Sequence, residues 1–286
     1  MIVFDARRCE LGEGPLWHPQ RGQLFWFDIL GGTLMSRAGE EALSWDFGEL
    51  VSAAGWIDRD HLLVAAESGL WRCAIETGAR ERVAPFPAGA VALRSNDGRA
   101  DPWGGFWIGR MGKQAEERAG GIWRLWRGEL RAVRTGITIP NAICFDAERE
   151  LGYFADTRAG TVWAQRLDPA TGWPAGEPRV FLDLTEAGLH PDGAVIDSEG
   201  RFWNAQWGAG RVACYAPDGR FVREERFEAT RTSCPAFGGA ALGTLFVTSA
   251  QEGMDAAARD AEPSAGMTFA RELDVRGRPE PAVVLG

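Results

Sequence analysis

Short doublets of aromatic or aliphatic residues recur along this chain at a nearly constant interval of 37 to 49 residues. The doublets begin at Trp26, Leu63, Trp107, Phe154, Trp203 and Phe246. Around each one the same order of turn, apolar strand, turn and second strand recurs, as in RELGYFADTRAGTVWAQRLDPATG. Units of about 44 residues that are rich in strand formers match the blades of a β-propeller. The sequence therefore predicts an all-β, six-bladed β-propeller that occupies residues 1–286 as a single domain.

Two other architectures fit the repeat less well. A two-sheet sandwich has many short strands but no doublet at constant period, and a parallel α/β fold needs long amphipathic helices between its strands. The one notable helix-like stretch, residues 254–261, is predicted to be a surface excursion within the last unit. The apolar ends MIVF and PAVVL are expected to pair within one sheet and so close the ring.

Composition excludes several classes of partner. A formal net charge of −9 argues against nucleic-acid binding, which needs clustered positive charge. No apolar run approaches the length of about eighteen residues that a membrane span needs. Charges at Asp5, Arg7 and Arg8 stand where a signal peptide has its apolar stretch, so a cytoplasmic protein without a membrane partner is expected. The five dispersed cysteines form no CxxC pair and are predicted to be buried free thiols, and no feature sets an oligomeric state.

Polar residues fall at one phase of the repeat. Five of them lie 11 or 13 positions before the doublet of their unit: Glu13, Arg94, Asn96, Asn141 and Asp192. Each precedes an apolar run expected to form the first strand of a blade, and the first strands of a propeller line its central channel. Taken singly, an Asn or Asp at a turn is usually a backbone cap. Five polar residues at one phase, with both signs of charge, favour a site at one mouth of the channel.

The matching positions of the other two units are neutral, in LVSA at residues 50–53 and SCP at residues 233–235. One side of the mouth is therefore predicted to be polar and the other neutral, which suits a small ligand better than a ring of symmetric caps. A carboxylate, a carboxamide and a carboxylate form a hard oxygen set, typical of sites for Ca²⁺, Mg²⁺ or Mn²⁺.

Other catalytic or metal-binding patterns are missing from the sequence. The histidines, His18, His61 and His190, form no HxH or HExxH pair and stand in polar turns, so they are predicted to lie on the surface. No GxSxG elbow of a serine hydrolase is present, and no glycine-rich segment has the strand-to-helix setting of a phosphate-binding loop.

Several motifs in order resemble one known family. GEGPLW, RSNDGRADPWGGFWIG, IPNAICFD, HPDGAVIDSEGRFW and TSCPAFGG are similar, almost end to end, to the SMP-30/gluconolactonase/LRE family of six-bladed propellers. The resemblance implies a divalent cation in the channel held by Glu13, Asn141 and Asp192. It also implies that Arg94 and Asn96 bind substrate oxygens and that Asp192 is the acid/base residue. Ca²⁺ is the expected ion, with Zn²⁺, Mn²⁺, Mg²⁺ and Fe²⁺ as alternatives.

The reaction that the resemblance implies is hydrolysis of a sugar lactone to its aldonic acid. In this scheme the cation polarises the lactone carbonyl and Asp192 accepts a proton from water. Two alternatives stay open at this point. One is a related propeller hydrolase of aryl esters or organophosphates, and the other is a non-enzymatic, calcium-binding propeller that acts as an interaction module.

The chain departs from the family pattern in one region. Arg110 stands where the family has Thr, in the segment Gly-Arg-Met. In the loop that follows, the family has a Glu that contacts the substrate. Alignment without gaps places Gln114 at that position, and Lys113 and the carboxylates at 116 and 117 are also within reach. The substrate-contacting role is assigned to none of these residues. This loop is expected to cover the mouth of the site. Of the tryptophans, Trp103 and Trp207 are expected nearest the channel end as surfaces for sugar stacking.

Overall fold

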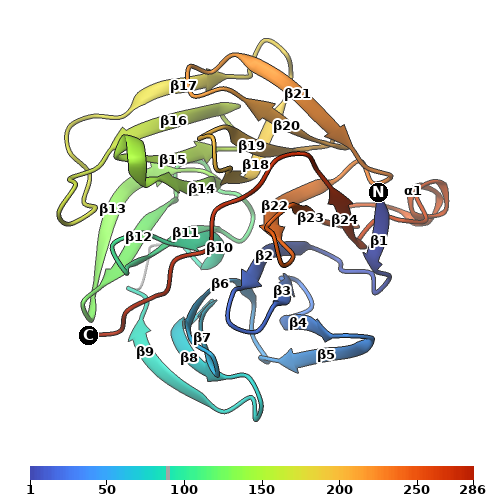
Figure 1. The fold of residues 1–286 in the computed structure, drawn as a ribbon, viewed down its shortest axis with the longest axis horizontal. Coiled ribbons are helices and arrows are strands. Elements are labelled where there is room, and N and C mark those ends of the chain that lie inside the picture. Colours follow the sequence, from blue (N-terminus) through green and yellow to red (C-terminus); the bar gives the residue numbers. More distant parts are fainter. Residues whose placement is uncertain (88–90) are drawn as a thin grey trace.

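The computed structural model describes residues 1–87 and 91–286, which form six four-stranded antiparallel sheets arranged in a ring (Figure 1). The first two blades are β2 (Gly12–His18), β3 (Gln23–Asp28), β4 (Thr33–Ala38) and β5 (Glu41–Asp46), then β6 (Val51–Asp58), β7 (His61–Ala66), β8 (Gly69–Ala74) and β9 (Arg80–Pro85). The third and fourth are β10 (Leu93–Ala100), β11 (Phe106–Gly112), β12 (Gly120–Trp126) and β13 (Glu129–Ile137), then β14 (Pro140–Asp146), β15 (Leu151–Asp156), β16 (Thr161–Arg166) and β17 (Arg179–Asp183), with the 3₁₀ helix η1 (Ala147–Arg149) after β14. The fifth and sixth are β18 (His190–Ile196), β19 (Phe202–Trp207), β20 (Arg211–Tyr215) and β21 (Phe221–Arg226), then β22 (Thr232–Gly238), β23 (Thr244–Ser249), β24 (Thr268–Glu272) and β1 (Ile2–Asp5).

The doublets that carry the sequence repeat all lie on the second strand of a blade, in β3, β7, β11, β15, β19 and β23. These strands are buried between neighbouring sheets, and Trp26, Trp107 and Trp203 are at most 1% exposed. Trp107 packs edge-on against Phe145 of the next blade, with ring centroids 5.3 Å apart. Burial of large side chains between blades therefore produces the period seen in the sequence.

The two chain ends behave differently from each other. The N-terminal strand β1 pairs with β24 and completes the sixth blade, as predicted. The expectation that PAVVL joins the same sheet is wrong, because β1 already occupies the free edge of β24. Residues 273–286, which we call the C-terminal segment, instead cross one face of the ring (red in Figure 1). The segment is held there by Val283 N–H, which donates to Trp56 O at 2.8 Å, and by Val284 N–H, which donates to Gly104 O at 2.9 Å.

The remaining expectations about the fold have mixed outcomes. The helix α1 (Ala256–Ala261) lies between β23 and β24 and buries no residue, as predicted for a surface excursion. All five cysteines are free and buried. Within residues 1–87 and 91–286, no helix is long and apolar enough to cross a membrane.

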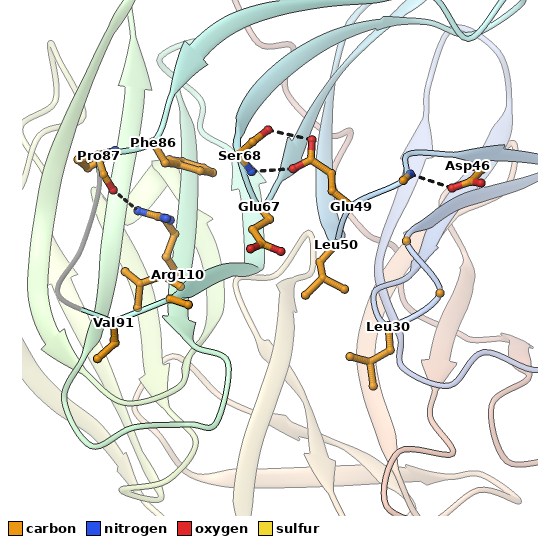
Figure 2. A pocket seen from close by; sticks show the side chains of 15 residues that line it. Leu30, Asp46, Glu49, Leu50, Glu67, Ser68, Phe86, Pro87, Val91 and Arg110 are labelled. Atoms are coloured by element: carbon orange, nitrogen blue, oxygen red, sulfur yellow. Dashed lines mark hydrogen bonds between the residues drawn. The ribbon is translucent and has the colours of Figure 1, made fainter.

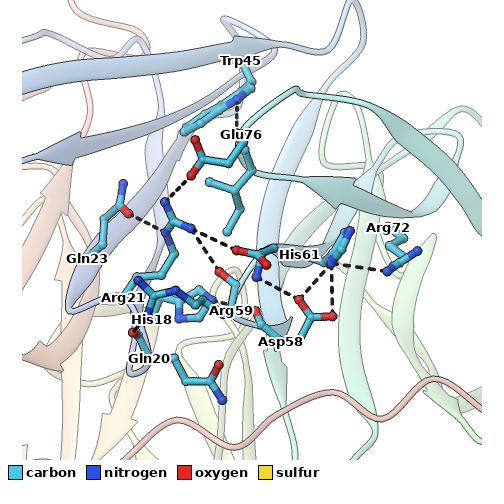
Figure 3. A network of polar contacts seen from close by, with 12 residues as sticks. His18, Gln20, Arg21, Gln23, Trp45, Asp58, Arg59, His61, Arg72 and Glu76 are labelled. Atoms are coloured by element: carbon cyan, nitrogen blue, oxygen red, sulfur yellow. Dashed lines mark hydrogen bonds and ion pairs between the residues drawn. The ribbon is translucent and has the colours of Figure 1, made fainter.

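The prediction of surface histidines is wrong for His18. Its ring is buried at the end of β2, 5.6 Å from the Trp56 ring, and Nε2 lies 3.0 Å from Asp58 O (Figure 3). The residue closes the gap between the first two blades, which a polar turn in the sequence does not reveal. His61 lies outside the gap between these two blades, and its Nδ1 is 2.9 Å from Asp58 Oδ1.

Candidate active site at one end of the channel

A β-bulge at the same level of all six inner strands places the candidate site residues. Each inner strand shifts register against the second strand of its blade at or beside Glu13, Ser52, Asn96, Asn141, Asp192 or Ser233. A bulge takes residues out of the ladder and redirects their side chains, and it often borders an active site. The repeated bulge therefore explains why polar residues at one phase of the sequence converge on one level of the channel.

Left-handed backbone accompanies the bulge in two blades. Gly14 and Ala142, directly after Glu13 and Asn141, have φ values of 54° and 55°. A Cβ on Gly14 would lie 2.2 Å from Ser52 O, so any other residue at the second glycine of GEGPLW would clash with the backbone of the next blade. Ala142 holds the same conformation without being glycine, which costs about 1 kcal/mol. Such strain is typical of positions that fix a functional side chain.

The five predicted residues line one cavity of about 660 Å³, a size that suits a sugar. Glu13 comes from the first blade, Arg94 and Asn96 from the third, and Asn141 and Asp192 from the fourth and fifth. The equivalent residues of the second and sixth blades, Ser52 and Ser233, are fully buried and donate to backbone carbonyls of the neighbouring blades. At this level the inner strands are thus polar on one side and neutral on the other, as predicted.

Glu13 and Asp192 bring two buried carboxyl groups together. They lie within hydrogen-bonding range of each other, and both residues are about 5% exposed. Burial, then the charge of Asp97, raises the pKa of Glu13 to about 8. Burial and the neighbouring Glu13 carboxylate raise the pKa of Asp192 well above its usual value. Two carboxylates in such a position repel each other unless a proton or a cation is shared between them.

Asn141 presents its carbonyl oxygen at the same place, and its orientation is fixed by hydrogen bonds. Its Nδ2 donates to Thr157 Oγ1 at 2.7 Å, and the Thr157 hydroxyl donates its only proton to Pro191 O at 2.7 Å. Because that hydroxyl can only accept from Asn141, the carboxamide cannot turn over. Oδ1 accepts from Asn96 Nδ2 at 2.8 Å and keeps a second lone pair for another partner.

Asn96 connects Arg94 to this group. Its Nδ2 donates both to Asn141 Oδ1 and to Pro140 O at 3.1 Å, and its Oδ1 accepts from Arg94 Nη1 at 2.7 Å. The carboxamide therefore has no free donor in this arrangement, and it orients its two neighbours. Arg94 is buried, and its Nη1 also donates to Ser95 O at 3.0 Å. Burial lowers the pKa of this guanidinium, which has no carboxylate within ion-pair distance in the part of the chain that the structure describes.

Glu252 joins the site although it lies outside the phase of the five predicted residues. It comes from the turn between β23 and α1, is half-buried, and lines the same cavity. Its charge is the largest attraction felt by Arg94, ahead of Glu13 and Asp192. The sequence signal that could have found it is the polar segment QEGMD directly after a buried strand. The mouth therefore has an acidic side chain in front of the neutral sixth blade.

The donor set fits a hard divalent cation. Within residues 1–87 and 91–286, no group of three or more His, Cys, Asp or Glu side chains is placed to hold a metal ion. The predicted ligand set is of a different kind, because it consists of two carboxylates, Glu13 and Asp192, and the carboxamide of Asn141. Two neighbouring carboxyl groups with raised pKa values, together with an oriented amide oxygen that keeps a free lone pair, provide three oxygen ligands on one side of a cavity. Such sets bind Ca²⁺, Mg²⁺ or Mn²⁺ and leave positions open for water and substrate.

A family comparison agrees with this arrangement. The model of the SMP-30/Gluconolactonase/LRE-like region matches residues 11–251. The chain belongs to this family. A pentonolactonase of Haloferax volcanii is 35% identical over 95% of this chain and 94% of its own length. A Rhizobium meliloti protein, provisionally named a sugar lactone lactonase, is 41% identical over 99% of this chain and 98% of its own length.

A solved relative has nearly the same fold. The crystal structure described as a calcium-binding protein, regucalcin from Agrobacterium tumefaciens, superposes with a TM-score of 0.96 at 38% identity, covering 99% of this chain and 97% of that one. The six-bladed propeller predicted from the sequence is thus confirmed by the structure and by its relatives.

The loop in which this member departs from the family pattern does border the mouth. Lys113, Gln114 and Ala115 line the cavity, whereas the Glu116 carboxylate turns back to accept from Gln114 N–H at 3.1 Å. Lys113 Nζ forms an ion pair with Glu67 at 2.5 Å. Gln114 is therefore the residue of the loop that is free to contact a ligand by hydrogen bonds.

Arg110, which replaces the family Thr, points into a neighbouring hollow (Figure 2). Its Nη1 donates to Pro87 O at 3.0 Å, and its guanidinium lies 4.4 Å from the Phe86 ring centroid. Of the two predicted stacking surfaces, Trp207 lines the site cavity. Trp103 does not, because it follows β10, which runs from Arg94 at the mouth toward the opposite end.

Proposed function

We propose that this protein hydrolyses a sugar lactone to the corresponding aldonic acid, with a divalent cation, Ca²⁺ first among the candidates, held by Glu13, Asn141 and Asp192. The observation that carries the proposal is the pair of buried carboxyl groups beside an oriented amide oxygen, in a cavity large enough for a sugar. Relatives named for lactone hydrolysis align over nearly the whole chain, which supports the same reaction class here.

The cation would polarise the lactone carbonyl and stabilise the negative charge that develops on its oxygen. The residues of the chain supply the rest of the chemistry. Asp192 takes the proton of the attacking water, a step worth about 10² to 10⁴ in rate. Asn141 cannot turn its amide group toward the site because Thr157 holds it, so its oxygen stays available as a ligand.

Arg94 and Glu252 bind the sugar hydroxyls in this proposal. The Arg94 guanidinium offers forked donors, and the Glu252 carboxylate offers acceptors from the opposite wall of the cavity. Asn96 acts as a positioning residue, because its amide hydrogens already bind Asn141 and Pro140. Trp207 adds an apolar surface at the rim, and the paired donors and acceptors favour a hydroxylated substrate over an aryl ester.

The experiment is a panel of glucono-, galactono-, xylono- and arabinonolactone, tested on chelated protein to which single divalent metals are added back. The proposal predicts metal-dependent hydrolysis of at least one lactone above the spontaneous rate. Hydrolysis of aryl esters or organophosphates alone would replace the substrate class. Metal binding by calorimetry without turnover of any substrate would favour an interaction module instead.

A further inference from the structure

A groove beside the active-site cavity gathers three arginine side chains. It lies between the third and fourth blades, has a volume of about 460 Å³, and is lined by Arg118, Arg134 and Arg158 together with Phe154 and Trp163. We call it the arginine groove. Ala115 and Arg158 line both the groove and the active-site cavity, so the two hollows meet at these residues.

The guanidinium groups of the groove have few partners. Arg118 and Arg158 form hydrogen bonds only through their backbone amides, to Thr138 Oγ1 and Asp156 Oδ1, among the residues that the structure describes. Arg134 Nη1 lies 3.9 Å from Glu177, whose side chain is 93% exposed, and such a pair contributes little. Arg134 also lies over the Phe154 ring, 5.7 Å from its centroid, and Arg118 borders a second hollow as well. All three arginines are exposed, and the side chains of Arg118 and Arg158 remain available to a ligand in the groove.

Two carboxylates also line the groove, and they do not neutralise it. Asp156 is buried, and its oxygens accept the backbone N–H groups of Thr138, Ile139 and Arg158 at 2.8 to 3.1 Å. The second, Glu117, is exposed. Three guanidinium groups therefore face two carboxylates, one of which is already hydrogen-bonded to three amides.

The hollow on the other side of the mouth has the opposite charge. It is lined by Asp46, Glu49 and Glu67, with Arg110 as its one basic residue among those that the structure describes (Figure 2). Positive charge is therefore concentrated on one flank of the mouth, in a chain whose formal net charge is −9. A general excess of arginine does not explain this difference between the two flanks.

The loop that separates the groove from the active site holds an unusual shape. Ala115 and Arg118 both have left-handed backbone, with φ values of 52° and 55°, although neither is glycine. Thr138 Oγ1 accepts the Arg118 amide and holds the residue in this conformation beside the groove. Non-glycine residues with left-handed backbone concentrate at functional sites.

The arginine groove lies close to Asn141, one of the predicted cation ligands. Arg158 directly follows Thr157, whose hydroxyl accepts from Asn141 Nδ2 at 2.7 Å. Asn141 and Arg158 also line the same active-site cavity. One small molecule in that cavity can therefore contact both residues.

We infer that the arginine groove binds an anionic substituent of the substrate, so that the preferred lactone carries a phosphate, sulfonate or carboxylate group away from its ring ester. Guanidinium forks match the oxygens of these groups in paired hydrogen bonds. The inference rests on the proposed lactonase function and specifies its substrate class. An acidic lactone gains the groove contacts in addition to those of the hydroxyl-binding residues.

The test compares two substrates on the metal-loaded protein, glucono-1,5-lactone and its 6-phosphate, after subtraction of spontaneous hydrolysis. We expect kcat/KM for the phosphorylated lactone to exceed that for the neutral one about tenfold in the wild type. Arg158→Gln and Arg118→Gln should each lower this ratio about three- to tenfold, because hydrogen bonds to charged groups are among the stronger ones. Arg220→Gln, which changes an exposed arginine between β20 and β21, is the matched control and should leave the ratio unchanged.

The outcomes separate the two proposals. Hydrolysis of neither lactone overturns the proposed function. Hydrolysis of the neutral lactone without preference for the phosphate, or a ratio that both groove variants leave intact, overturns the arginine groove alone. Inorganic phosphate is the remaining arm: it should compete with the phosphorylated lactone. A groove that responds to free phosphate while the ratio stays at one is an effector site, which also contradicts the inference.

Discussion

The two ends of the central channel both hold buried charged residues, which form ion pairs at one end but, in the part of the chain that the structure describes, lack them at the other. At the far end, Arg99 forms a buried ion pair with Glu280 of the C-terminal segment, and Arg124 Nε bonds to Asp101 Oδ2 at 2.7 Å with both side chains fully buried. At the site end, Glu13 and Asp192 lie beside each other, and within residues 1–87 and 91–286 neither forms an ion pair, although both attract the nearby Arg94. The charged side chains at the far end are thus paired with opposite charges, whereas the carboxyl groups that β2 and β18 bring to the site end lie beside each other.

This difference separates stability from function along one set of strands. A buried ion pair stabilises only while both partners are present, and loss of one partner leaves an uncompensated buried charge. The site end instead holds two carboxyl groups whose pKa values are raised by burial, and a bound cation would favour their ionised forms. We therefore expect substitutions at the far end to lower the free energy of unfolding, and substitutions at the site end to change activity without lowering it.

Asp192→Asn should have the largest effect. Lactone hydrolysis should fall by about 10³-fold or more, because the variant loses both the proton acceptor and one negatively charged ligand. The unfolding temperature should stay the same or rise, since the repulsion with Glu13 is relieved. Initial rates and thermal unfolding of the same preparation measure both. Near-normal turnover would remove Asp192 from its role as base.

Glu280→Ala should have the next largest effect, on stability. It removes the ion-pair partner of the buried Arg99 and leaves the attraction of Asp97 as compensation, which should lower the free energy of unfolding by about 3 kcal/mol in urea titrations. The folded fraction should keep its metal affinity and kcat. Glu280→Gln, which retains a hydrogen-bond acceptor, provides a milder variant should the alanine form not fold. Unchanged stability in both would contradict the contrast between the two ends.

Glu252→Gln should have a smaller effect, confined to substrate binding. Loss of a charged acceptor for sugar hydroxyls should raise KM about tenfold and leave kcat within about threefold. Glu186→Gln, which changes an exposed carboxylate before β18 that does not line the cavity, is the control. A fall in kcat at constant KM would instead place Glu252 among the groups that act on the transition state.

The smallest expected effect is on the pH dependence of stability in chelated protein. The pKa of Glu13 is raised from 4.5 to about 8, so the folded state binds more protons than the unfolded state between these values. Stability should therefore fall as pH rises from 7 to 8, by about 2 to 4 °C in unfolding temperature. His18, whose pKa burial lowers from 6.5, acts mainly below this window. Glu13→Gln should reduce the slope without abolishing it, because burial also raises the pKa of Asp192. An equal slope in the variant would assign the effect to other groups.

The sequence allowed prediction of the propeller and of one side of its mouth, for a physical reason. Large side chains such as Trp107 must pack between blades, which imposes a period, and the bulge at one level of each inner strand gives the polar residues a common phase. Residues outside the inner strands share no such phase. Glu252 comes from a turn after a second strand, so only its three-dimensional position identifies it.

Two further expectations were wrong. One depended on which strand edge was free to pair, and the other on the direction in which a strand runs from the mouth. PAVVL has the composition of a strand, but β1 had taken the edge of β24, and the segment crosses the ring instead. Trp103 lies close in sequence to Arg94, yet β10 carries the chain away from the mouth before it is reached. Strand composition was readable from the sequence, whereas strand pairing at the ring closure was not.

In this proposal the site end binds a divalent cation through Glu13, whereas the far end takes no part in cation binding. Calorimetric titration of chelated protein with Ca²⁺ tests it most directly, comparing the wild type, Glu13→Gln and the far-end variant Glu280→Gln. We expect one site in the wild type and unchanged affinity in Glu280→Gln. In Glu13→Gln the affinity should be weakened on the order of 100-fold, because one ligand charge is lost. Equal affinity in the wild type and Glu13→Gln would contradict it.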